Sequence, residues 1–148
     1  RDFQNEMNAL IQALCLHYDA CLTGAFEENP LYYAYAPQGV AAPYVVANLI
    51  TQDHTNAMGA YGTAGGSYEE YVVQFTVIDA ERAGLADLLT GYAALCWAFD
   101  EADIPLTGAS CIRMRRLTTV GPMPDPDAMD GGWMLTVDYL IETDTEII

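Results

Sequence analysis

The stretch Tyr68–Phe99, YEEYVVQFTVIDAERAGLADLLTGYAALCWAF, changes from a period of two residues to a period of 3.6 with no linker between the two parts. Its first part alternates apolar and polar side chains, which predicts a strand with one buried face. In the second part apolar residues recur every three or four positions, which predicts an amphipathic helix. These helical residues are Leu85, Leu88, Leu89, Tyr92, Leu95, Cys96 and Phe99. Asp79 stands where the N-cap of that helix is expected.

Two glycines of this predicted helix, Gly84 and Gly91, lie seven residues apart and therefore on one stripe. A missing side chain on that stripe would let another element approach closely. Weak helix propensity without a packing role is the alternative.

The rest of the chain adds elements on both sides of this unit. Apolar spacing predicts a first helix from Phe3 that ends at Thr23-Gly24, and β-branched residues predict a strand over Pro43–Thr51. Further strands are expected over Cys111–Val120 and Trp133–Ile141. We therefore expect one domain, residues 1–148, of the α+β class. It would hold a mainly antiparallel sheet of four or five strands with two amphipathic helices on one face.

Composition excludes several classes of protein. No run of about 18 apolar residues is present, and the first 22 residues lack the apolar segment of a signal peptide, so a soluble, non-secreted protein is expected. Four cysteines form no C-x-x-C pair and are expected as buried free thiols. The chain has no lysine, which removes a P-loop lysine and every lysine Schiff base.

The net charge of −16 comes from 21 acidic residues against five arginines. Such a field repels phosphate and argues strongly against binding to a simple DNA duplex. Surface hydration in a saline or GC-rich host is the favoured explanation of the acidity. An acidic face along which a moving polyanion slides without sticking is the alternative.

Three arginines, Arg113, Arg115 and Arg116, lie within four residues of one predicted strand. The last strand carries acidic residues on one face, among them Asp138 and Glu142, which Arg113 and Arg115 could meet across an antiparallel pair. Ion pairs within the chain are the simpler interpretation. An inter-subunit salt link formed by these five residues is the sharper one.

Several other patterns carry little chemistry. His17 beside an apolar stripe is more often structural than a metal ligand, and the glycine-rich connection Gln52–Ser67 is followed by no helix or lysine that would hold a phosphate. Aspartates of the hairpin Gly121–Gly132 miss the calcium-loop spacing. The tyrosines of the segment Ala25–Ala42 either cover the edge of the core or meet a partner. We expect no catalytic residue, metal or cofactor.

The order of elements, together with three stretches, resembles the tail terminator or tail-completion proteins of long-tailed bacteriophages. The stretches are Ala36–Val46 (APQGVAAPYVV), Tyr71–Ala80 (YVVQFTVIDA) and Gly131–Glu142 (GGWMLTVDYLIE). This resemblance covers nearly the whole chain and implies a structural virion protein that is not an enzyme. Such a protein forms a ring, usually of six copies, that caps the tail tube in the neck and joins it to the head-side connector.

The resemblance also implies partners and a place. The protein would bind other copies of itself, the tail tube protein and the head-side connector or stopper protein. It would assemble in the host cytoplasm and be located in the tail or neck of the virion. DNA would pass the lumen without specific binding, and no membrane is involved. The amino-acid composition of two loops makes them candidates for contact with a partner. Their residues are Gly59, Tyr61, Gly62, Pro124, Asp125 and Asp127.

Three other functions stay open on sequence. A head-closure or stopper ring of the neck is the nearest, because nothing in the sequence separates it from a terminator. A small-molecule-binding or enzymatic α+β domain would use Asp53 and His54 as an acid and base pair, although adjacent residues seldom converge. An acidic regulator that mimics DNA would need two rows of carboxylates.

Overall fold

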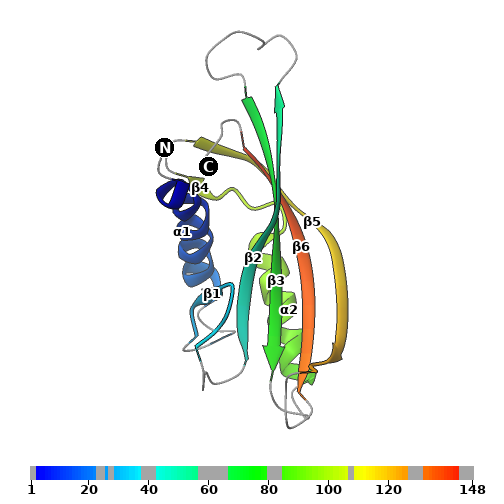
Figure 1. The fold of residues 1–148 in the computed structure, drawn as a ribbon. Coiled ribbons are helices and arrows are strands. Elements are labelled where there is room, and N and C mark those ends of the chain that lie inside the picture. Colours follow the sequence, from blue (N-terminus) through cyan, green and yellow to red (C-terminus); the bar gives the residue numbers. More distant parts are fainter. Residues whose placement is uncertain are drawn as a thin grey trace.

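The computed structural model describes residues 3–22, 26, 29–37, 43–56, 67–79, 85–106, 109–126 and 132–143. Within them lie two helices and six strands (Figure 1). In chain order these are α1 (Phe3–Leu22), β1 (Leu31–Tyr33), β2 (Tyr44–Asn56), β3 (Ser67–Asp79), α2 (Leu85–Phe99), β4 (Pro105–Leu106), β5 (Ala109–Pro124) and β6 (Trp133–Thr143).

The strands form one sheet in the order β1-β2-β3-β6-β5-β4. All neighbours are antiparallel except β1, which runs parallel to β2. This arrangement confirms the α+β class and the mainly antiparallel sheet. The short strand β1 falls within the tyrosine-rich segment, and the two-residue strand β4 extends the sheet beyond the expected number.

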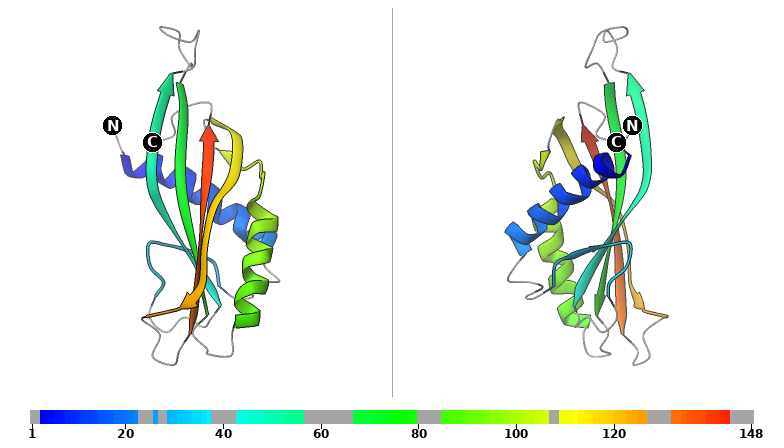
Figure 2. Two further views of the ribbon diagram at one scale, coloured as in Figure 1. Left: turned by 90° about the vertical axis from the view of Figure 1, so that its right-hand side faces the viewer. Right: turned by 60° about the vertical axis from the view of Figure 1, so that its left-hand side comes forward.

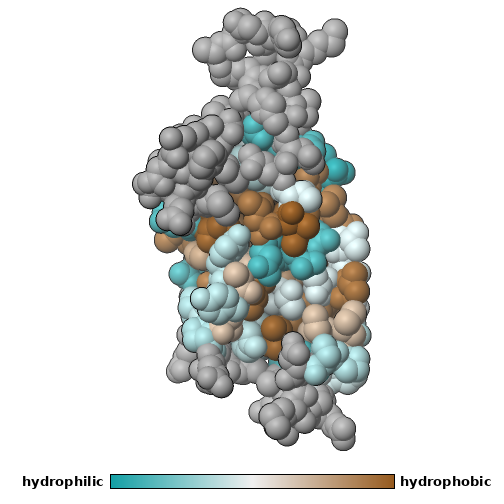
Figure 3. Space-filling model, in the orientation of Figure 1, coloured by the Kyte–Doolittle hydropathy of each residue, from teal (hydrophilic) through white to brown (hydrophobic). Residues whose placement is uncertain are grey.

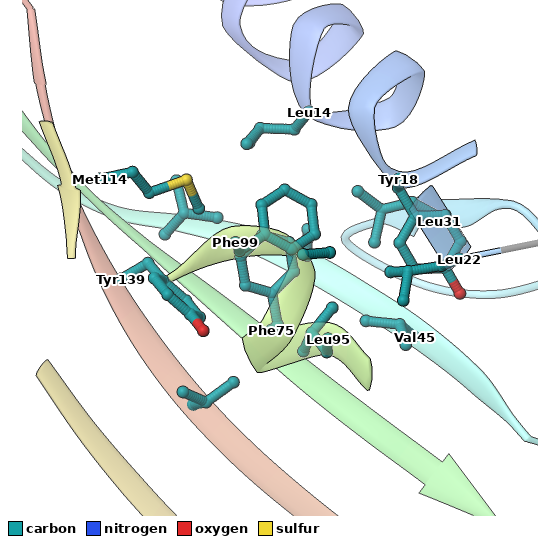
Figure 4. Close-up of a cluster of buried hydrophobic side chains, with 14 of the residues drawn as sticks. Leu14, Tyr18, Leu22, Leu31, Val45, Phe75, Leu95, Phe99, Met114 and Tyr139 are labelled. Atoms are coloured by element: carbon teal, nitrogen blue, oxygen red, sulfur yellow. The ribbon is translucent and has the colours of Figure 1, made fainter. Parts of the chain in front are cut away.

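Both helices lie on the same side of the sheet (Figure 2). Helix α2 packs on β3, β5 and β6, whereas α1 packs on α2 and on the short strands β1 and β4. The core between helices and sheet is aromatic at its centre (Figure 4), where Phe75 stacks on Phe99 with ring centroids 4.9 Å apart. Tyr139 meets Phe75 edge-on at 5.7 Å. Strand β3 thus supplies the buried face that its period of two predicts.

Gly91 has the packing role that its position on the helix stripe predicts. A Cβ atom built at Gly91 would lie 2.8 Å from Cζ of Phe26, whose buried ring covers this turn of α2. Only a glycine therefore lets the ring of Phe26 lie against the helix backbone. Gly84 lies outside the described residues.

Two expectations for the β3–α2 unit are wrong. Asp79 is not an N-cap, because it is the last residue of β3, pairs with Trp133 and is only 4% exposed. Helix α2 begins at Leu85, six residues after Asp79. Leu89 is 41% exposed rather than buried. It lies 100° from the buried Leu88 around the helix, on the exposed side.

The connection between β2 and β3 is shorter than predicted. Gln52–Asn56 continue β2 and Ser67 begins β3, with Asn56 opposite Ser67. Polar residues continue the ladder because its hydrogen bonds join backbone groups. The cysteines also differ from expectation: Cys96 is buried, but Cys15 is half-buried and Cys21 exposed, and all three are free thiols.

Candidate assembly surfaces

The side chain of Arg116 connects β5 to helix α2. Its Nη1 donates to the hydroxyl of Tyr92 at 2.9 Å and to Sγ of Cys96 at 3.1 Å, and its Nη2 lies 3.4 Å from Oδ2 of Asp100. Because Tyr92 accepts from the guanidinium, its own proton is free to bond Oγ1 of Thr119, 2.7 Å away. Arg116 is thus used within the chain.

Asp100 also joins α2 to the last strand. The hydroxyl of Tyr139 donates to Oδ1 of Asp100 at 2.6 Å. Burial, and then this hydrogen bond, raise the pKa of Tyr139 well above its usual value of 10. The phenol therefore stays protonated and remains a donor.

Arg113 and Arg115 flank the buried Met114, so strand alternation directs them to the other face of the sheet. Arg113 lies opposite Glu142 in the ladder, but its ion pair is with Glu101, at 3.7 Å and between exposed side chains. Arg115 lies opposite Leu140 and is exposed. Among the described residues Arg115 has no ion pair, so it is the arginine of the three best placed to meet another chain.

Of the two predicted acidic partners, Glu142 lies opposite an arginine and Asp138 does not. The register between β5 and β6 shifts between Arg116 and Thr118, so Thr118 instead of Leu117 lies opposite Asp138. Asp138 also pairs with Gln74 of β3, and its Oδ1 is buried without a hydrogen bond. A β-bulge of this kind cannot be read from alternation alone. A contact of Asp138 or Glu142 with a neighbouring subunit stays a prediction.

Helix α2 carries an apolar stripe on its outer side, which the sequence analysis did not predict as a surface feature. Leu89, Ala93 and Trp97 follow one another at a spacing of four, and the indole of Trp97 is 82% exposed. The spacing was visible in the sequence, because four residues return to the same side of a helix. An exposed tryptophan is a common anchor of protein interfaces.

A depression of about 300 Å³ lies on the face of the sheet that the helices leave open, at the start of β2. We call it the tyrosine notch. Its walls are the segment after β1 and residues of β2 and β3, and none of them carries a formal charge. They are Ala34, Tyr35, Ala36, Tyr44, Val46, Asn48, Thr76 and Ile78. Within the predicted tyrosine segment, Tyr32 packs edge-on against Tyr44 in the fold, whereas Tyr35 is 79% exposed, and its contact with a partner stays a prediction.

The predicted loop contacts are described only in part. Pro124 ends β5 and is exposed, and the amide of Asp125 donates to the carbonyl of Gly132 at 2.8 Å, which fixes the start of the hairpin. The remaining predicted contacts lie outside the described residues. They are Gly59, Tyr61, Gly62 and Asp127.

The other candidate sites are described in part. His17 is structural: its Nε2 lies 2.8 Å from the carbonyl oxygen of Ala98 and its ring packs against Phe99. Where side chains are described, no group of histidine, cysteine or acidic residues could hold a metal. Asp53 and His54 lie in β2, opposite Glu70 and Glu69. No described helix is long and apolar enough to cross a membrane.

The protein is thus a mainly antiparallel sheet with two helices on one face, and its described surface carries exposed aromatic and charged side chains. No family model matches the chain, and no curated protein matches it. Solved structures share its fold. One is a chain of the "Virion of native gene transfer agent (GTA) particle", with a TM-score of 0.58, 20% identity and 91% of each chain covered.

A second solved protein, whose name states no function, has a TM-score of 0.59 and 13% identity, and the match covers 95% of this chain and 94% of that one. Identities this low show a common fold. Both matches span nearly all of each chain, so the likeness in fold extends over most of the sequence given.

Proposed function

We propose that this chain is a structural protein of a phage or phage-like virion that forms a ring at the end of the tail. Its role would be that of a tail terminator, which caps the tail tube and joins it to the head-side connector. The observation that carries the proposal is the similarity in fold, over 91% of both chains, to a chain of a gene transfer agent virion. The surfaces described above agree with a protein that acts through contacts.

The two edges of the sheet support association of copies side by side. Strand β1 covers β2 only at Val45–Ala47, and β4 covers β5 only at Ala109 and Ser110. In the described part of the chain, most of the outer edges of β2 and β5 therefore carry no neighbouring strand. Free edges on opposite sides of a sheet suit a heterologous contact, in which one edge meets the other edge of the next copy.

The net charge of the chain agrees with a ring whose central channel lets DNA pass. A protein with a net charge of −16 repels the phosphates of DNA, so a duplex could pass through without being held. We therefore assign no specific DNA contact to any residue.

Light scattering on the purified chain tests the proposal, alone and with tail tubes of the same particle. We expect a closed ring of defined mass that binds one end of the tube, visible by electron microscopy. Binding to the head-side connector without the tube would indicate a head-closure ring instead. A monomer at every concentration that binds neither component would contradict the proposal.

A further inference from the structure

The tyrosine notch is unusual in this chain because its lining is uncharged. The whole protein has a net charge of −16, yet none of the described residues that line the notch is acidic. Ala34 at its rim has a φ of 70°, a conformation that a residue other than glycine rarely adopts. This turn carries the chain after β1 over the open face of the sheet and leaves the ring of Tyr35 exposed. The notch can therefore receive an apolar group without desolvating a charge.

A segment with matching chemistry lies at the other edge of the sheet. We call residues 121–126 (GPMPDP) the proline segment. Its three prolines are all exposed: Pro122, Pro124 and Pro126. Proline has little conformational freedom to lose on binding and packs well in grooves lined by aromatic rings. Exposed prolines at every second position are thus suited to a tyrosine-lined notch.

The notch and the proline segment lie at the same height on the molecule. Tyr44 pairs with Ile78, Ile78 with Met134 and Met134 with Met123, so a single row crosses the sheet from one feature to the other. Both features are found where β2 begins and β5 ends (Figure 1).

We propose that the proline segment of one copy binds in the tyrosine notch of the next copy. The inference rests on the ring of the proposed function and names the contact that closes it. Rotation about a ring axis keeps every copy at one height, so a contact between lateral neighbours needs two complementary patches at one level on opposite edges. The notch and the proline segment meet this condition. Asp125 is the one charged residue of the proline segment and the described lining of the notch carries none, so the contact adds little to the repulsion between copies as acidic as these.

Two matched variants test the contact by light scattering on the full chain. Tyr35→Ala removes the exposed wall of the notch, and Pro124→Ser with Pro126→Ser alters the proline segment. Each should weaken self-association at least tenfold, whereas Leu16→Ala, exposed on α1, should leave it unchanged. Circular dichroism and thermal melting verify that each variant folds as the wild type does.

A mixture of the two variants makes the test specific. Each would keep one intact patch, so an equimolar mixture should form dimers but no larger species. A photoreactive phenylalanine analogue at position 35 should crosslink to residues 121–126 of another copy, identified with isotopically mixed subunits.

The outcomes separate this contact from the ring itself. Unchanged rings in both variants, or crosslinks to another region, would overturn the contact and leave the ring standing. A small molecule that stays in the notch and excludes the proline segment would overturn it as well. A wild-type chain that never assembles would overturn both.

Discussion

The two faces of the sheet share the same strands but differ in what their side chains do. On the face under the helices Tyr71, Val73 and Phe75 of β3 are fully buried. On the other face the alternate residues Gln74 and Thr76 are half-buried. Figure 3 shows hydrophobic and hydrophilic residues side by side on the surface turned to the viewer.

The open face carries a polar row that a core would not tolerate. Asn48, Gln74, Asp138 and Thr118 lie opposite one another across four strands. The buried Oδ1 of Asp138 makes no hydrogen bond, which costs free energy in a face built for stability alone. The difference teaches that the covered face fixes the fold, and it leaves the open face available for contacts between chains.

The largest effect should come from the covered face. Phe75→Ala removes the ring that stacks on Phe99 and meets Tyr139, and should lower the free energy of unfolding by about 3–5 kcal/mol. The adjacent variant Thr76→Ala, on the open face, should lower it by less than about 1 kcal/mol. Urea unfolding at one protomer concentration measures both. Equal losses would mean that the two faces do not differ in their contribution to stability.

The next effect sharpens the comparison at the contact of α2 with Phe26. Gly91→Ala gains about 1 kcal/mol of helix propensity but forces the ring of Phe26 to move, so a net loss of about 1 kcal/mol is expected. In a Phe26→Leu background the same change should be neutral or stabilising. A double-mutant cycle from urea unfolding measures this coupling. Additive effects would show that the ring does not restrict this position.

Much of the fold follows from the sequence because two periods are uninterrupted in it. The alternation in β3 and the apolar spacing of α2 place the strand and helix correctly, and Gly91 indicates a close approach. The end of β3 at Asp79 could not be predicted, because pairing with β6 and not local capping chemistry sets it.

The candidate surfaces were harder to predict for a different reason. The partners of Arg113 and Arg116 lie at the end of α2, and the bulge after Arg116 changes which residues of β5 and β6 meet. The tyrosine notch joins the segment after β1 to strands β2 and β3, so no single stretch of sequence contains it. Tertiary contacts decide both features, and alternation within one strand carries no information about them.

Alkaline pH should destabilise the covered face through Tyr139. Burial raises the pKa of Tyr139 in the folded chain above the value of 10 for an ordinary tyrosine. This contribution to stability is complete below pH 10 and is lost as pH rises toward the raised pKa, by at most about 1.4 kcal/mol per pH unit. Urea unfolding between pH 8 and 11 measures the slope. Tyr139→Phe should reduce it, and an unchanged slope would contradict this assignment.

The smallest effect on stability, and the one that tests the open face most directly, is expected from Arg115. Arg115→Glu should change the free energy of unfolding by less than about 0.5 kcal/mol, since the side chain is exposed. If this arginine meets an acidic residue of a neighbouring copy, the variant should associate more weakly, and its self-association should depend less on salt concentration than that of the wild type. Arg113→Gln is the matched comparison, because Glu101 already lies beside Arg113 within the chain. Sedimentation of both variants at two salt concentrations separates the cases. If the two variants behave equally, Arg115 is not part of the interface. Loss of assembly in the Arg115 variant alone would show that the open face serves association and not folding.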